Sequence, residues 1–256
     1  DLRMSRGLGD VYKRQVKGDY YLSEREEEDL RYLAEMNKPV ILILNAGGPV
    51  ELTDILEQTD NIKGILNISQ LGQEGGEALA DVLLGKEVPG GKLTTTWARR
   101  YEDYPASEEY GYLNGNLEKE KYKEGIYVGY RYFDSFDKKV MFPFGFGLSY
   151  TMFEMKCCSI NMEESKIRAE VQVTNTGNEY AGKEVVQIYV TLPQTELEKE
   201  YKRLAGFAKT RLLKPGETQT LTVEIPQKQL ASFNEETHTW IVEKGKYGIL
   251  IGNSSD

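Results

Sequence analysis

The chain has 256 residues, of which 39% are hydrophobic and 29% charged, and its formal net charge is −9. This length allows two ordinary domains, because a single domain typically has about 100–200 residues. No apolar run approaches the roughly 18 residues that a membrane span requires. No clustered basic face is available to bind phosphates. We therefore expect two domains that bind neither nucleic acid nor membrane.

The cysteines and the single histidine argue against a disulfide framework and against a metal site. Cys157 and Cys158 are adjacent in a predicted strand, so their side chains point to opposite faces. His238 lies in a polar turn between Glu236 and Trp240, and we interpret it as a surface residue rather than a catalytic base. The sequence has no C-x-x-C pair and no nucleotide-binding glycine motif, so we expect neither a metal nor a cofactor.

The first part of the chain alternates helices and strands. Ser23 and Glu26 match a capping box, which predicts a helix over Glu24–Asn37. The aliphatic run Val40–Leu44 predicts a strand buried on both faces of a parallel sheet. Further along the chain we expect a helix at Glu51–Gln58, a strand at Gly64–Ile68 and a helix at Gly75–Leu84, which Gly85 ends. This order is typical of an α/β domain, whose ligands bind beyond the carboxyl ends of the strands.

A long irregular connection follows, from Pro89 to Ser135, with one short predicted strand at Leu93–Thr96. It is rich in tyrosine between Tyr101 and Tyr132. Rings with a polar tip fill wet interfaces and also line sugar-binding surfaces. We favour the interface with a neighbouring domain.

The hydrophobic period changes to two after residue 150. Turn signals such as Asn175-Thr176-Gly177 separate the strand-like runs. We expect strands at Phe153–Ile160, Ile167–Asn175, Glu184–Leu192, Arg203–Leu212, Thr218–Ile225, Thr239–Val242 and Tyr247–Ile251. Seven short strands in about 100 residues are typical of an immunoglobulin-like or fibronectin-type sandwich.

Blocks along the whole of this pattern resemble the carboxyl-terminal half of glycoside hydrolase family 3 enzymes, the β-glucosidases in particular. The resemblance runs from Val16 to the end and includes KPVILILNAGGPVEL, GQEGGEALADVLLGKEVPGGKLTTTW, EGIYVGYRYFD, FPFGFGLSYTMFE and VTNTGNEYAGKEVVQIYV. The FGFGLSYT and NTG…AGKEVVQIYV segments are specific to that family. The blocks occur in the family's order.

The resemblance implies a retaining, exo-acting β-glycosidase that removes terminal β-linked sugars from oligosaccharides or glycosides. Such an enzyme has an amino-terminal (β/α)₈ barrel, an α/β sandwich domain and a fibronectin type III-like domain. The barrel is missing from this sequence. We therefore expect a non-native, unstructured junction at residues 1–15, part of the α/β sandwich domain at 16–100, the connection at 101–150 and the fibronectin type III-like domain at 151–256.

Neither catalytic carboxylate of the family is carried over to this chain. The nucleophilic aspartate belongs to the barrel, and the acid/base glutamate would fall near Gly9, where the sequence reads GLGDVYKRQ. Asp10 stands in an unmatched context. Glu24, Glu26, Glu27 and Glu28 are interpreted as the solvated amino end of a helix. We therefore expect this chain alone to be catalytically inactive.

Three residues at the predicted carboxyl edge of the sheet match family motifs and are the candidates for substrate binding: Asn45, Gln73 and Glu74. We favour loop and cap hydrogen bonding over sugar contact for them. Tyr130, Arg131 and Tyr132 match a block that docks the connection, and Arg131 is a candidate for a buried ion pair or a stacking contact.

A second hypothesis is a free-standing module without catalytic activity that binds carbohydrate or stabilises a partner. The sequence does not fix the sugar specificity. The scarcity of cysteine favours the cytoplasm and leaves export open.

Overall fold

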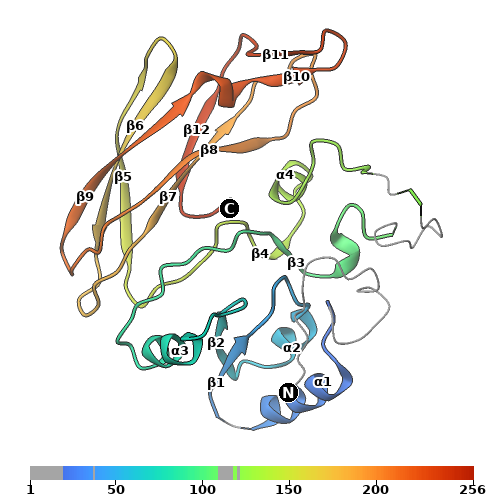
Figure 1. The fold of residues 1–256 in the computed structure, drawn as a ribbon, viewed down its shortest axis with the longest axis vertical. Coiled ribbons are helices and arrows are strands. Elements are labelled where there is room, and N and C mark those ends of the chain that lie inside the picture. The colour runs from blue at the N-terminus through green and yellow to red at the C-terminus, as the bar shows by residue number, and fades with distance from the viewer. Residues whose placement is uncertain (1–19, 37, 109–117, 120–121) are drawn as a thin grey trace. The chain divides into compact units, whose positions relative to one another are not determined.

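The computed structural model describes residues 20–36, 38–108, 118–119 and 122–256 (Figure 1). The contacts divide the chain into two compact units. Among the described residues, the first unit takes its members from 1–81, 97–125 and 139–142, and the second takes its members from 82–96, 126–138 and 143–256. The first is α/β and the second is a β-sandwich, which confirms the predicted fold class, α/β plus all-β.

Helix α1 (Glu24–Glu35) begins at the predicted capping box. The backbone N–H of Ser23 donates to Glu26 Oε2 at 2.9 Å, and the backbone N–H of Glu26 donates to Ser23 Oγ at 3.3 Å. These two bonds satisfy donors that the first turn of a helix otherwise leaves unpaired. The predicted last residue, Asn37, lies outside the described residues.

Strands β1 (Val40–Leu44) and β2 (Ile62–Asn67) pair in parallel, as the alternation of helices and strands predicted. The prediction that β1 is buried on both faces is wrong. Ile41 and Ile43, on one face of β1, are 58% and 38% exposed, whereas Leu44 on the other face is buried. The apolar composition of β1 therefore leaves an exposed apolar face on this strand.

Two helices complete the α/β part, α2 (Thr53–Gln58) and α3 (Gly75–Leu83). As predicted, Gly85 follows the end of α3 and closes it: it has a φ of 72° and donates its N–H to the carbonyl of Val82 at 3.0 Å. A positive φ costs glycine little because it lacks a Cβ.

The long connection contains structure that the sequence pattern did not predict. The strand that the connection contains is β3 (Trp97–Ala98), which pairs with β4 (Val140–Phe142). The prediction of a strand at Leu93–Thr96 is wrong. Within that predicted strand, Leu93 exchanges backbone hydrogen bonds with Gly145 and Phe146 at 2.8 Å each. A 3₁₀ turn, η1 (Tyr101–Asp103), and the short helix α4 (Tyr130–Ser135) also lie in the connection.

The second unit contains two three-stranded antiparallel sheets, in the orders β5-β6-β9 and β12-β7-β8, and the hairpin β10-β11. All seven predicted strands are present. Their bounds are β5 Phe153–Met162, β6 Lys166–Asn175, β7 Val185–Thr191, β8 Lys202–Lys209, β9 Thr218–Pro226, β11 Thr239–Ile241 and β12 Gly248–Gly252. The strand β10 (Ser232–Asn234) and the 3₁₀ turn η3 (Gln227–Leu230) were not predicted.

The core of this unit follows from the period of two. Alternate residues of β6 are buried throughout its length, and Val171, Val173 and Ile188 have no exposed surface. Side chains from both sheets meet in one apolar cluster. Burial of this kind stabilises a sandwich by roughly 25 cal/mol per Å² of apolar surface.

The cysteines and the histidine lie at the surface. Cys157 and Cys158 are free and exposed, and a bulge between Cys157 and Ser159 interrupts the regular alternation of β5. His238 is exposed in the turn between β10 and β11 with a φ of 53°, in agreement with its interpretation as a turn residue.

Candidate functional site

The carboxyl edge of the parallel pair carries all three predicted binding residues. Leu44 lies opposite Asn67, so the loops that follow β1 and β2 leave the sheet at the same edge. The backbone N–H of Ile68 extends the pairing by donating to the carbonyl of Leu44 at 2.9 Å. Asn45 follows β1 directly, and the second loop leads to Gln73 and Glu74.

The side chains of Asn45, Gln73 and Glu74 are exposed. In the described part of the chain none of these side chains makes a hydrogen bond or an ion pair. The carbonyl of Glu74 accepts from the N–H of Ala78 at 3.1 Å and so opens the first turn of α3. The backbone of Glu74 therefore has a structural role. That Asn45, Gln73 and Glu74 bind sugar stays a prediction.

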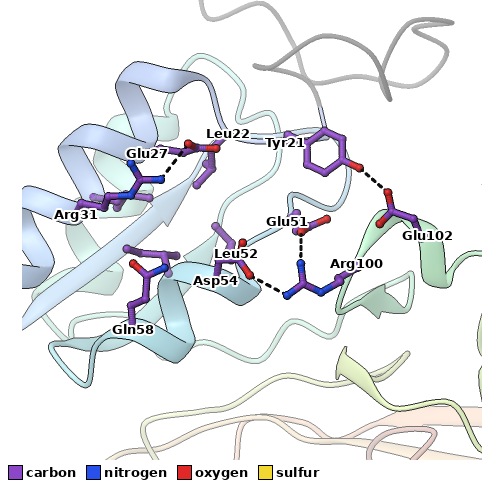
Figure 2. A pocket seen from close by; sticks show the side chains of 12 residues that line it. Tyr21, Leu22, Glu27, Arg31, Glu51, Leu52, Asp54, Gln58, Arg100 and Glu102 are labelled. Atoms are coloured by element: carbon purple, nitrogen blue, oxygen red, sulfur yellow. Dashed lines mark hydrogen bonds and ion pairs between the residues drawn. The ribbon is translucent and has the colours of Figure 1, made fainter.

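A groove of about 340 Å³ lies between α1, α2 and the segment after β3 (Figure 2). Its walls carry charges of both signs and a few apolar side chains. The charged members are Glu27, Arg31, Glu51, Asp54, Arg100 and Glu102. Sequence reasoning did not predict this groove, because its lining comes from segments up to about eighty positions apart.

Arg100 connects the two walls of the groove. Its Nη2 donates to Asp54 Oδ1 at 3.0 Å, and its Nη1 lies 3.9 Å from Glu51 Oε1 (Figure 2). Glu51 also accepts from the backbone N–H of Tyr101 at 3.1 Å. Burial raises the pKa of the Glu51 carboxyl, and the hydrogen bond from Tyr101 opposes that rise. These contacts tie the segment after β3 to the amino end of α2.

The tyrosines beside the groove pack against one another. The ring centroids of Tyr20 and Tyr101 are 5.2 Å apart in an edge-to-face arrangement, and Tyr104 joins them at 5.9 Å from Tyr20. Burial raises the pKa of the Tyr20 hydroxyl. Tyr101 is buried and Tyr104 is partly buried within the first unit. The expectation that the tyrosines of the connection form an interface with a neighbouring domain stays a prediction.

The outer rim of the groove is closed by weaker polar contacts. The hydroxyl of Tyr21 donates to Glu102 Oε1 at 3.2 Å, and Arg31 donates to Glu27 Oε2 at 3.3 Å within α1 (Figure 2). The last pair follows the spacing of four residues that brings side chains together on a helix. The carboxylates of the groove are therefore engaged by neighbours.

Arg131 lies in α4 and forms the predicted ion pair. Its Nε is 3.7 Å from Glu200 Oε1. The prediction is only half right about burial, because the glutamate side chain is 3% exposed and the arginine side chain 41%. The arginine therefore keeps much of its contact with water, and the buried carboxylate of Glu200 is held more closely by Arg203, whose Nε is 2.8 Å from Oε1.

No three histidine, cysteine, aspartate or glutamate side chains gather around a cation position in the part of the chain that the structure covers. Within the same residues, no helix is long and apolar enough to cross a bilayer. The positions near Gly9 and Asp10, where the resemblance places the acid/base loop, lie outside the described residues.

Two family models match this chain. The glycosyl hydrolase family 3 C-terminal domain matches residues 9–130, and the fibronectin type III-like domain matches residues 184–255. Residues 9–15 of the predicted junction therefore fall inside the first match. That residues 1–15 are a non-native junction stays a prediction, and so do the domain limits that depend on it.

Curated relatives and solved structures agree with these matches. Beta-glucosidase A of Butyrivibrio fibrisolvens is 40% identical over 259 residues, which cover 93% of this chain and 31% of the relative. A beta-glucosidase of Kluyveromyces marxianus is 39% identical and is covered to 27%. The structure of beta-glucosidase 3B from Thermotoga neapolitana with α-D-glucose aligns with a TM-score of 0.87 at 42% identity, covering 95% of this chain and 34% of that one.

An α/β unit of this kind joined to a fibronectin type III-like sandwich defines the carboxyl-terminal domains of a glycosidase. The chain belongs to glycoside hydrolase family 3 and corresponds to the carboxyl-terminal part of its β-glucosidase members. It spans about a third of the length of the relatives that it matches.

Proposed function

We propose that this chain is the carboxyl-terminal part of a retaining, exo-acting β-glycosidase that hydrolyses terminal β-linked sugars. The observation that carries the proposal is the match of 93% of the chain to a β-glucosidase at 40% identity. A solved relative with 42% identity is described as a complex with glucose. β-Linked oligosaccharides or glycosides are the substrates that this similarity supports.

We further propose that this chain is inactive by itself. A retaining glycosidase needs two carboxyl groups about 5–5.5 Å apart, one as nucleophile and one as general acid/base. In the groove, Glu51 and Asp54 lie against Arg100, and Glu27 lies against Arg31. Each of these carboxylates is thus engaged by a guanidinium group within the groove. This supports a barrel and an acid/base loop supplied from outside the chain.

The proposed division of labour assigns structural work to both units. The first unit would present the loops with Asn45, Gln73 and Glu74 at the carboxyl edge of the sheet. The sandwich would stabilise the assembled enzyme. We keep residues 16–100, 101–150 and 151–256 as the proposed limits of the two domains and their connection.

A chromogenic β-glucoside tests the proposal in two arms. The chain alone should give no turnover above background. A chimera should be active when it keeps Butyrivibrio fibrisolvens beta-glucosidase A up to the position aligned with Tyr20 and continues with this chain. The chimera retains the acid/base loop of the relative, so activity requires only that this chain replaces the remaining domains.

The two arms test separate statements. Turnover by the isolated chain would contradict the proposed inactivity. A folded but inactive chimera would contradict the proposal that this chain serves a β-glucosidase. The matched control is the intact relative carrying the same affinity tag, which fixes the expected rate.

A carbohydrate-binding module without catalytic activity is the second candidate. The specific observation in its favour is a pair of exposed aromatic side chains on the hairpin of the second unit.

A further inference from the structure

The hairpin β10-β11 places two aromatic side chains side by side in water. Phe233 and Trp240 are direct cross-strand partners. Their ring centroids are 5.4 Å apart and the ring planes are inclined by 61°. Trp240 is 70% exposed and Phe233 is 44% exposed. Large apolar side chains gathered in this way on a surface commonly mark a binding site.

The base of the hairpin is fixed to the sandwich. Arg203 of β8 donates to the carbonyl of Ala231 at 2.6 Å and to Ser232 Oγ at 3.2 Å. The same guanidinium donates to Glu200 Oε2 at 3.0 Å. Ala231 and Ser232 are buried. The strands that carry the two rings therefore start from a rigid anchor.

The turn of the hairpin is also held in place. Asn234 Oδ1 accepts from the backbone N–H groups of Glu236 and Thr237, both at 2.9 Å. This is the side-chain turn that asparagine commonly forms. Binding to a surface that is already ordered costs less entropy than ordering it on contact. Phe233 and Trp240 thus form a preorganised pair of rings.

The polar groups of the hairpin fit a neutral sugar. The hydroxyls of Thr237 and Thr239 lie 2.8 Å apart at the turn of the hairpin, and Glu235 and Glu236 of the same turn are exposed. The electron-rich face of an aromatic ring attracts the weakly positive C–H groups of a pyranose. Hydroxyl and carboxylate groups can bond the sugar hydroxyls. The carboxylates disfavour nucleic acid and anionic lipid.

The size of the surface also favours a sugar over a protein partner. Two rings offer an area suited to one or two pyranose units, whereas a stable protein partner covers about 800 Å² on each side. We propose that Phe233 and Trp240 are a stacking platform for a neutral β-linked carbohydrate chain. The choice of β-linked sugars as the ligand class rests on the proposed function.

Affinity electrophoresis in gels that contain a soluble β-glucan tests the platform on the full chain. The β-glucan should retard the unmodified chain, and Trp240→Ala should reduce the apparent affinity at least about tenfold. Trp240→Tyr should keep most of the retardation, because tyrosine still presents a ring. Phe207→Ala is the matched control, since Phe207 on β8 is 68% exposed but does not belong to the platform.

Tryptophan fluorescence gives a second readout. The chain has two tryptophans, and Trp97 is 3% exposed, so a change on adding soluble β-glucan reports on Trp240. The change should disappear in Trp240→Ala. Circular dichroism checks that the variants fold, which is expected because the substituted rings project into water.

Four results would each overturn the platform. The first is an unmodified chain that runs identically with and without β-glucan, and the second is retardation of Trp240→Ala as strong as that of the unmodified chain. The third is that Trp240→Ala abolishes self-association in sizing experiments but leaves the retardation by β-glucan unchanged, which would mean that the rings contact a second copy of the chain. The fourth is retardation by an α-glucan alone, which would contradict the β-linked ligand. These readouts need no hydrolysis, so an inactive chimera leaves them unaffected.

Discussion

The side chain of Asn175 accepts a hydrogen bond of 2.6 Å from the hydroxyl of Thr151, twenty-four residues earlier in the chain. Its Oδ1 also accepts from the N–H of Gly177 at 3.0 Å. Its Nδ2 donates to the carbonyls of Tyr180 and Leu213 at 2.9 and 2.8 Å. The side-chain amide thus uses both donors and both acceptor positions, and Asn175 has no exposed surface.

Replacing Asn175 with alanine should destabilise the second unit by about 3 kcal/mol, because buried partners of the amide are left without hydrogen bonds. By calorimetry, the transition of that unit should move down by roughly 6–12 °C. Asn161→Ala is the control, because Asn161 is exposed on β5. An equal transition temperature in the two variants would show that the network contributes nothing specific.

The ion pair between Lys92 and Glu184 makes a second prediction. The two charged atoms are 2.8 Å apart, with the side chains 11% and 7% exposed, and Lys92 also donates to the carbonyl of Gly147 at 2.8 Å. Lys92→Met leaves a buried carboxylate without its cation, which should cost about 3–5 kcal/mol. The urea midpoint of the second unit should fall accordingly.

The double substitution separates lost attraction from an uncompensated charge. Lys92→Met combined with Glu184→Gln should recover part of the stability, because no buried charge remains. The single variant Glu184→Gln gives the cost of the second substitution alone. If the double variant were less stable than Lys92→Met by that same free energy of unfolding, the two side chains would not be coupled.

The sandwich could be predicted from the sequence because its strands follow a single rule. One face of each sheet is buried, so alternate residues such as Val171 and Val173 are apolar and the period of two is visible. The connection follows no such rule. β3 has two residues and α4 has six, so neither is long enough to show a period.

The candidate site could be predicted only in part. The parallel order of β1 and β2 locates Asn45 and the loop before α3 at one edge, as the sequence indicated. The groove depends on Arg100 meeting Glu51 and Asp54, which are about fifty positions earlier in the chain. A contact between distant segments leaves no local pattern, so it was found only in the structure.

Asp134 of α4 makes stability dependent on pH. Burial raises the pKa of its carboxyl from 3.8 to about 6, against the opposing effect of Lys202, whose Nζ is 3.4 Å from Oδ2, while Asp256 adds to the rise. A raised pKa in the folded state means that the contribution of Asp134 is fully present below pH 3.8 and is lost as the pH rises through about 6.

Asp134→Asn should therefore flatten this pH dependence. The stability of the variant relative to the unmodified chain should increase between about pH 4 and pH 6 and then stay level, as measured by urea unfolding at each pH. Glu154→Gln is the control because Glu154 is exposed on β5. A relative stability of Asp134→Asn that decreases over this range would reverse the assigned sign.

The exposed face of β1 makes the last prediction. Ile41 and Ile43 are two positions apart on one strand and project from the same face, where they are 58% and 38% exposed. An uncovered apolar strand promotes association, so the chain should elute from a sizing column as oligomers whose share increases with concentration. Substituting both isoleucines with threonine keeps the β-branched shape and removes apolar surface. It should weaken association about tenfold or more, whereas Phe207→Thr should not. A monodisperse monomer at every concentration would contradict the prediction.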